Sequence, residues 1–140
     1  MAWVLWWDGV IETISGITNA WQPERCKTEK DFENSLLKKL QEELKDQRIQ
    51  SQYGSGAQRV DIVIDKNIAI EIKKDLKNTS VLQRLIGQME LYIKDWEYLF
   101  IILCGNIKPD LLKDLKSYIE NKNSELGCIF NDRVVLLIKN

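Results

Sequence analysis

Histidine is absent from all 140 residues of the chain. This excludes nucleophilic catalysis by Ser-His or Cys-His pairs, and it excludes metal centres that need imidazole ligands. Acid–base or metal chemistry must therefore rest on carboxylates, lysine or tyrosine. Cysteine is scarce as well, and Cys26, Cys104 and Cys128 form neither a Cys-x-x-Cys pair nor a zinc spacing. Such an odd, dispersed set predicts free thiols in a reducing, cytoplasmic setting.

The chain also lacks an excess of charge of either sign, with 20 Lys and Arg against 21 Asp and Glu and a net charge of -1. Near-neutrality counts against a nonspecific DNA coat protein but allows an enzyme with a local basic surface. Long hydrophobic runs are missing too. The tryptophan-rich N-terminus is interrupted by Asp8 and Glu12, and it is shorter than the ~20 apolar residues of a membrane span. We therefore expect neither a signal peptide nor a membrane association.

Apolar spacing predicts the secondary structure. Thr28, the capping-box pattern of Ser80 with Gln83, and Pro109 mark expected helix starts. The predicted order after residue 28 is helix, three strands, helix, strand, helix, strand, which indicates an α/β fold around a mixed sheet. The expected elements are a helical segment over 3–17, a helix near 29–46, strands over 49–53, 59–64 and 68–74, a helix near 80–96, a strand over 98–104, a helix near 109–121 and a strand over 133–139.

The two strands over 59–74 can be aligned with each other from sequence alone. Their alternating apolar residues share one face if the turn is Asp65-Lys66-Asn67. Asn67 then falls where a left-handed residue is wanted. The pairs expected on the buried face are Val60 with Ile72, Ile62 with Ile70, and Ile64 with Ile68.

On the other face of this hairpin, Asp61 lies opposite Glu71, and Lys73 follows two residues along. Like charges placed so destabilise a sheet by up to ~1 kcal/mol, and burial would force the carboxylates to share a proton or a counter-ion. A divalent cation resolves the conflict, since hard oxygen ligands suit Mg²⁺. The alternative is that Asp61 and Glu71 lie on the solvated face of an edge hairpin.

Polar residues also interrupt the apolar stripes of two predicted helices. Glu33 lies on or beside the stripe of Leu36 and Leu40, and Gln88 breaks the stripe that continues to Tyr92. A buried glutamine without partners is costly, so Gln88 is expected to face a polar site. Glu29 and Asp31 lie close to Glu33 on the same predicted helix, so they are alternatives for the acidic residue that faces the site.

A helical Glu33 is followed by Asp61, nine further residues and then Glu71-x-Lys73. This pattern resembles the PD-(D/E)XK nuclease superfamily. Residues 88–92, Gln-Met-Glu-Leu-Tyr, look like the QxxxY motif of its RecB-like branch. The resemblance covers roughly residues 29–105, although Val60 stands where the name implies proline and no iron–sulfur cysteines are present. It implies a restriction-endonuclease-like αβββαβ core with a central mixed sheet flanked by helices. Residues 26–140 would form this single domain, and residues 1–25 a tryptophan-rich extension.

The resemblance implies a Mg²⁺-dependent deoxyribonuclease, in which Mn²⁺ could substitute. Asp61 and Glu71 would hold the ion with the backbone carbonyl of Ile72, and Glu33 would ligate it directly or through water. Lys73 would orient or deprotonate the attacking water, or stabilise charge on the phosphate.

Gln88 and Tyr92 would position these groups or the DNA backbone. Cutting both strands of a duplex would favour a homodimer. Further phosphate contacts, which specify no sequence, are expected from Arg59, Lys74, Lys77 and Arg84.

Two other interpretations stay open at this point. The chain could be a non-catalytic nuclease-fold module that binds DNA or protein, or an unrelated α/β domain that binds a partner through its N-terminal tryptophans. Those tryptophans could pack onto the core as an extra helix, form a dimer seam, or present aromatic surface to bases or to a protein.

Overall fold

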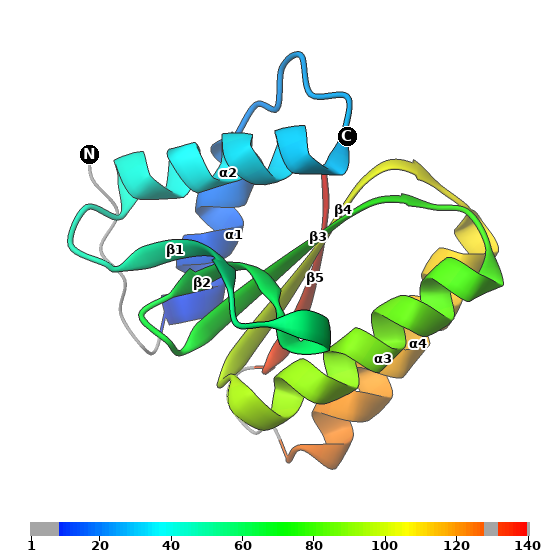
Figure 1. The fold of residues 1–140 in the computed structure, drawn as a ribbon. Helices are drawn as coiled ribbons and strands as arrows, with labels where there is room; N and C mark the ends of the chain where they lie inside the picture. The colour runs from blue at the N-terminus through cyan, green and yellow to red at the C-terminus, as the bar shows by residue number, and fades with distance from the viewer. Residues whose placement is uncertain (1–8, 128–131, 140) are drawn as a thin grey trace.

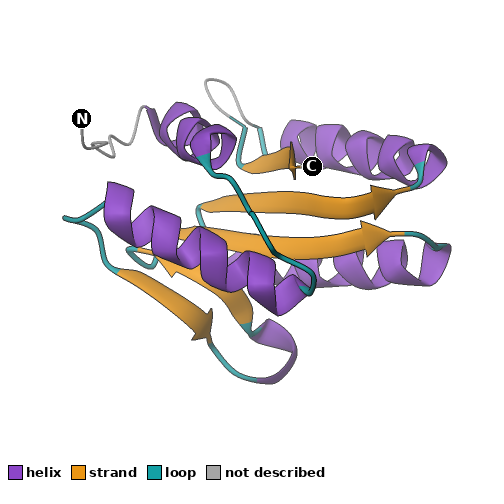
Figure 2. Ribbon diagram, turned by 90° about the horizontal axis from the view of Figure 1, so that it is seen from above, coloured by secondary structure: helices purple, strands orange, loops and turns teal. Residues whose placement is uncertain are grey.

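A mixed five-stranded sheet lies between two pairs of helices (Figures 1 and 2). The computed structural model describes residues 9–127 and 132–139. The elements are α1 (Val10–Ala20), α2 (Glu29–Glu43), β1 (Ile49–Tyr53), a 3-10 turn (Gly56–Gln58), β2 (Val60–Ile64), β3 (Ile68–Leu76), α3 (Thr79–Asp95), β4 (Tyr98–Ile107), α4 (Pro109–Glu125) and β5 (Val134–Lys139).

The strands lie in the sheet in the order in which they occur in the chain, from β1 to β5. β1, β2 and β3 form an antiparallel meander, and β3, β4 and β5 are parallel. Helices α3 and α4 make the two crossovers that parallel neighbours require. The predicted order of elements and the mixed sheet flanked by helices are therefore confirmed.

Local signals set the starts of the helices. In α2, the Thr28 hydroxyl accepts from the Asp31 backbone N–H at 3.1 Å, while the Asp31 carboxylate accepts from the Thr28 N–H at 3.0 Å. The predicted capping box at Ser80 is wrong. Asn78 caps α3 instead, because it still has extended backbone and its side-chain oxygen accepts from the Val81 N–H at 2.9 Å. Ser80 already lies in the first turn, where a side chain no longer reaches the free N–H groups.

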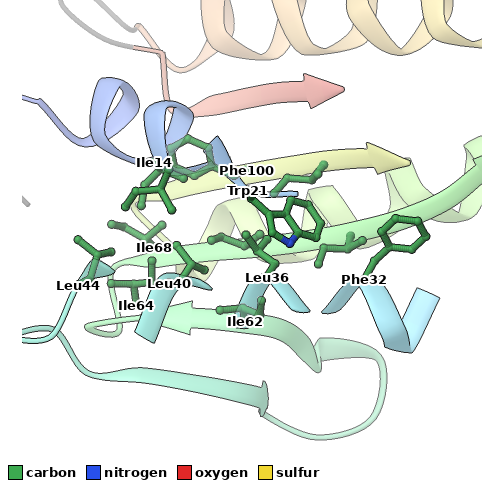
Figure 3. Close-up of a cluster of buried hydrophobic side chains, with 14 of the residues drawn as sticks. Ile14, Trp21, Phe32, Leu36, Leu40, Leu44, Ile62, Ile64, Ile68 and Phe100 are labelled. Atoms are coloured by element: carbon green, nitrogen blue, oxygen red, sulfur yellow. The ribbon is translucent and has the colours of Figure 1, made fainter. Parts of the chain in front are cut away.

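One face of the sheet packs against α1 and α2 (Figure 3). The isoleucines of β2 and β3 meet Leu36 and Leu40 of α2, and Val10, Ile14 and Ile17 of α1 are buried beside them. Trp21 closes this cluster, and its ring N–H donates to the Ser35 hydroxyl at 2.9 Å. The described part of the N-terminal extension is thus an extra helix packed onto the core. Trp3, Trp6 and Trp7 lie outside the described residues.

The other face packs against α3 and α4. Leu85, Met89 and Tyr92 of α3 are buried over the sheet, and Leu115 and Ile119 of α4 continue the same cluster. β4 is buried on both faces from Leu99 to Cys104, which explains its unbroken apolar run.

Two of the three predicted pairs of the β2–β3 hairpin are confirmed, since Ile62 pairs with Ile70 and Ile64 with Ile68. The regular pairing ends there, and Val60 does not pair with Ile72. Two details are wrong. Asp65 and Lys66 hold the positive φ angles of the turn, 54° and 62°, so Asn67 is not the left-handed residue.

Val60 packs with the α3–α4 face instead of joining Ile62. The alternation fails because the β1–β2 ladder skips the pair 52–61, where Gln52 has a φ of 51°.

A bulge near the end of β3 shifts its register with β4. Asp75 has a φ of 66°, and its carboxylate accepts from the Asn106 N–H at 2.8 Å and from Lys74 Nζ at 2.7 Å. A Cβ at Gly105, whose φ is 78°, would lie 2.3 Å from this carboxylate, so only glycine fits there.

Two remaining sequence expectations concern cysteines and membranes. Cys26 and Cys104 are free thiols, and burial raises the pKa of Cys104 to about 12. Cys128 lies outside the described residues. In the part of the chain that the structure describes, no helix combines the length and the apolar character needed to cross a bilayer.

Candidate functional site

A polar cleft of about 220 Å³ opens where β1, β2 and β3 meet the starts of α2 and the middle of α3. Gln52 and Asp61 do not pair in the β1–β2 ladder, which leaves this corner of the sheet open. The cleft is lined by Glu29, Gln52, Gly56, Arg59, Asp61, Glu71, Ile72, Lys73 and Gln88. Most of the residues that the sequence places at a site therefore come together here, although they derive from separate elements.

Asp61 has a structural contact as well as a place in the cleft. Its Oδ2 accepts from the backbone N–H of Ile72 at 2.9 Å. The side chain therefore satisfies a backbone donor of β3 just beyond the last regular pair of the hairpin, Ile62 with Ile70. This bond fixes the carboxylate against β3, beside Glu71.

Glu71 is the buried member of the carboxyl pair, with a relative exposure of 5%. Burial raises the pKa of Glu71 well above its ordinary range, and the neighbouring Asp61 carboxylate raises it further. Tyr92 and Lys73 oppose this shift. Without a cation, the two carboxyl groups therefore hold a proton between them at neutral pH.

Tyr92 is almost fully buried, and its hydroxyl group connects β3 to Arg59, the residue before β2. The hydroxyl lies 2.6 Å from the Arg59 carbonyl oxygen and 3.0 Å from Glu71 Oε2. A hydroxyl has one proton and the carbonyl can only accept. When Tyr92 donates to Arg59, its contact with Glu71 is a hydrogen bond only if Glu71 is protonated. Burial and the Glu71 charge both raise the pKa of Tyr92, so the hydroxyl keeps its proton.

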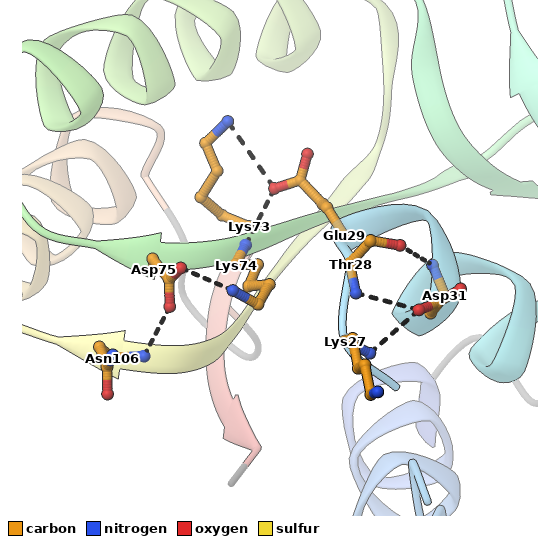
Figure 4. A network of polar contacts seen from close by, with 8 residues as sticks. All are labelled: Lys27, Thr28, Glu29, Asp31, Lys73, Lys74, Asp75 and Asn106. Carbon is orange, nitrogen blue, oxygen red and sulfur yellow. Dashed lines mark hydrogen bonds and ion pairs between the residues drawn. The ribbon is translucent and has the colours of Figure 1, made fainter. Parts of the chain in front are cut away.

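Lys73 extends from β3 into the same cleft, and its nearest acidic neighbour is Glu29 at the start of α2 (Figure 4). Lys73 Nζ lies 3.9 Å from Glu29 Oε1, and the same oxygen accepts from the Lys74 backbone N–H at 2.9 Å. Glu29 therefore ties the first turn of α2 to β3. The contact with Lys73 is long, so the amine keeps hydrogen-bonding capacity for a ligand.

Glu33 is buried, with a relative exposure of 4%, but it does not line the cleft. Its Oε1 accepts from Gln52 Nε2 at 2.6 Å and from Lys30 Nζ at 3.2 Å. Because Gln52 lines the cleft, Glu33 connects to it through that side chain. The structure places Glu29, one helical turn earlier, closer to Lys73.

The remaining predicted contacts divide by position. Gln88 and Arg59 line the cleft. Lys74 forms an ion pair with Asp75 outside it. Lys77 and Arg84 are exposed and are not among the lining residues.

The carboxylates of the cleft are the candidate ligands for a metal ion. Among residues 9–127 and 132–139, no three Asp, Glu or Cys side chains lie close enough to share one. The pair Asp61 and Glu71 still fits Mg²⁺, because this ion commonly takes one or two carboxylates and completes its octahedron with water and phosphate. Two adjoining carboxyls that share a proton in a polar cleft can exchange that proton for a cation. Ile72 also lines the cleft, and its backbone N–H donates to Asp61.

Glu29, Gln52 and Gly56 are the cleft residues that the sequence did not single out. Glu29 was only an alternative to Glu33, and helical spacing puts both on one side of α2. Gln52 gave no signal, since glutamine in a short strand is ordinary and its positive φ depends on the irregular ladder. No family model, curated protein or solved structure matches the chain.

Proposed function

We propose that the chain is a Mg²⁺-dependent nuclease that hydrolyses DNA phosphodiester bonds, with Mn²⁺ able to replace Mg²⁺. The observation that carries the proposal is the buried Glu71 carboxyl beside Asp61, with the Lys73 amine in the same polar cleft. Asp61 has a structural partner in the Ile72 N–H, but no backbone donor of the described residues needs a second, buried carboxyl at Glu71, and its proximity to Asp61 costs stability. The order α2, β1, β2, β3, α3, β4 is also the αβββαβ order that the PD-(D/E)XK resemblance implies.

Each residue has a role that follows from its contacts. Asp61 and Glu71 supply the oxygen ligands, and the Ile72 carbonyl is a third candidate. Tyr92 holds Glu71 in place from the Arg59 backbone. A divalent ion bound there would stabilise charge on the scissile phosphate and make a bound water more acidic. Lys73 is placed to donate hydrogen bonds to a phosphate oxygen or to the attacking water.

The reaction transfers a phosphoryl group to water. The water gives up one proton as its oxygen forms a bond to phosphorus, the bond from phosphorus to the leaving sugar oxygen breaks, and that sugar oxygen takes up one proton. Arg59 at the cleft is placed to contact a neighbouring phosphate, which would hold the backbone in register without reading sequence. Lys77 and Arg84 could only reach phosphates further along the strand, since they lie outside the cleft.

A cleavage assay tests the proposal directly. Supercoiled, linear and single-stranded DNA are incubated with Mg²⁺ or Mn²⁺ and with the wild type, Asp61→Asn, Lys73→Met or the control Lys38→Met, whose side chain is exposed on α2. We expect Asp61→Asn and Lys73→Met to lower the rate at least about 100-fold, and the control to match the wild type. Asn is chosen at 61 because its amide oxygen can still accept from the Ile72 N–H.

Metal binding gives a second readout that does not depend on turnover. Mg²⁺ should raise the melting temperature of the wild type and not of Asp61→Asn. Binding should also release about one proton at neutral pH, because the carboxyl pair must lose the proton it shares. DNA binding by folded wild type without cleavage in either metal would overturn the proposal and favour a non-catalytic nuclease-fold module.

A further inference from the structure

The two edges of the sheet differ in how they are protected. β1 carries the polar residues Gln50, Ser51 and Gln52, and the positive φ of Gln52 interrupts its pairing. β5 is apolar from Val134 to Ile138 and pairs with β4 without a break as far as Lys139. Proteins commonly blunt a free edge with charge, proline or a bulge, and residues 134–138 contain none of these. Within the described residues, no strand pairs with the outer side of β5.

A groove of about 400 Å³ runs beside this edge, between β5 and α4. Its floor is apolar and includes Ile138, which has a relative exposure of 41%. Lys116 and Glu120 lie on its α4 side, one helical turn apart. Neither side chain makes an ion pair or hydrogen bond with another of the described residues. The edge therefore combines free backbone groups, an apolar strip and two unpaired charges of opposite sign.

We propose that β5 pairs antiparallel with β5 of a second copy of the chain, about a twofold axis perpendicular to the sheet. The two sheets then form one continuous sheet, and α4 of each copy lies on the same face. Directly opposed residues in an antiparallel pair point to the same face. With Leu137 at the axis, Leu136 of each copy lies opposite Ile138 of the other, and the exposed apolar strip is covered.

The two unpaired charges on α4 favour a second copy of the chain as the partner of this edge. Because α4 and β5 pack together in each copy, the same twofold axis also places the two α4 helices antiparallel to each other. Lys116 of one copy then approaches Glu120 of the other, and the twofold axis repeats this contact. An unrelated extended strand would satisfy the backbone of β5 but would leave both charges unpaired.

The first test is the mass of the full chain in solution as a function of concentration. We expect the mass to rise from 16.4 kDa toward twice that value and to stop there, because pairing uses up both β5 edges. Ile138→Lys should raise the dissociation constant at least about tenfold, because it places two charged side chains in the apolar strip that the dimer covers. Ile138 is exposed in the monomer, so the change does not disturb the core. Ser51→Lys, an exposed position on the opposite edge, is the matched control and should leave the dissociation constant unchanged.

A charge exchange tests the twofold arrangement itself. Lys116→Glu alone puts four acidic side chains together at the interface, and Glu120→Lys alone puts four basic ones there. Each variant should dimerise more weakly than the wild type, and mixing the two variants should restore the dimer as a heterodimer. Circular dichroism of each variant checks that it is folded.

Three results would overturn the proposal. A wild type that stays monomeric at its highest soluble concentration would do so. A dimer that is unaffected by Ile138→Lys and by both charge changes would place the interface elsewhere, and growth beyond two copies would exclude the closed arrangement. None of these results depends on nuclease activity, because the variants lie outside the cleft.

Discussion

Replacing Glu71 with glutamine should make the unfolding free energy of the metal-free protein less dependent on pH. The Glu71 pKa is raised in the folded state, so the folded protein holds a proton that the unfolded chain releases near its ordinary pKa of 4.5. The stabilisation from that proton is fully present below the unfolded pKa. It is lost as pH rises toward the folded pKa.

The size of the effect follows from the linkage between protonation and folding. Each pH unit above the unfolded value costs the folded wild type up to about 1.4 kcal/mol, as long as the pH stays below the folded pKa. Between about pH 4.5 and about pH 7.5 the cost reaches at most about 4 kcal/mol. Lys73 offsets part of it, and we expect about 2–3 kcal/mol. Glutamine carries no charge and can donate to Asp61, so Glu71→Gln avoids this cost.

The assay is urea unfolding in EDTA at several pH values, with the wild type, Glu71→Gln and the control Glu42→Gln. Glu42 is exposed on α2, so its replacement should leave the pH dependence of the wild type intact. The stability difference between Glu71→Gln and the wild type should be small near pH 4.5 and should grow in favour of the variant as pH rises. A difference that stays constant over this range would refute the buried, proton-sharing carboxyl pair.

Five further substitutions test the contacts around the cleft, the sheet and the start of α3. Tyr92→Phe removes the hydroxyl that bridges the backbone and the buried carboxyl, and should lower the unfolding free energy by about 1–2 kcal/mol and weaken Mg²⁺ binding. Gly105→Ala should lower the unfolding free energy by about 1–3 kcal/mol, because it combines a positive φ with a clash. Gly87→Ala in α3 has open space and should raise the unfolding free energy by up to about 1 kcal/mol. Asn78→Ala should cost about 1 kcal/mol, and Ser80→Ala a few tenths, in the same unfolding assay. Equal effects of the last two substitutions would contradict the cap as described.

The hairpin that carries the site could be registered from sequence because its isoleucines alternate strictly. A slip of one residue would have moved that whole apolar set to the wrong face. The same alternation gave the wrong face for Val60, since it assumes a continuous ladder. The ladder breaks beside Asp61, and the break depends on the backbone of Gln52 in another strand.

The helical residues near the cleft show a second limit of the sequence. Glu29 and Glu33 are four residues apart on α2, so periodicity puts both on the same side and cannot choose between them. The choice is made by contacts from distant segments. Gln52 donates a hydrogen bond to Glu33, whereas Glu29 accepts from the β3 backbone and forms an ion pair with Lys73. Gln88 and Tyr92 were easier to place, because a polar residue within an apolar stripe signals a polar surface opposite it.

The bond from the Ile72 backbone to Asp61 bears on how related chains should be compared. A related chain without the proposed activity would still be under selection to keep an oxygen acceptor at 61, because the end of the hairpin depends on it. Retention of Asp61 would then report the fold and say little about activity. Lys73 has no comparable structural role, since its ion pair with Glu29 is 3.9 Å long and partly open to solvent. If the proposed activity is correct, homologues that preserve 61 but vary at 73 would be the ones expected to lack it.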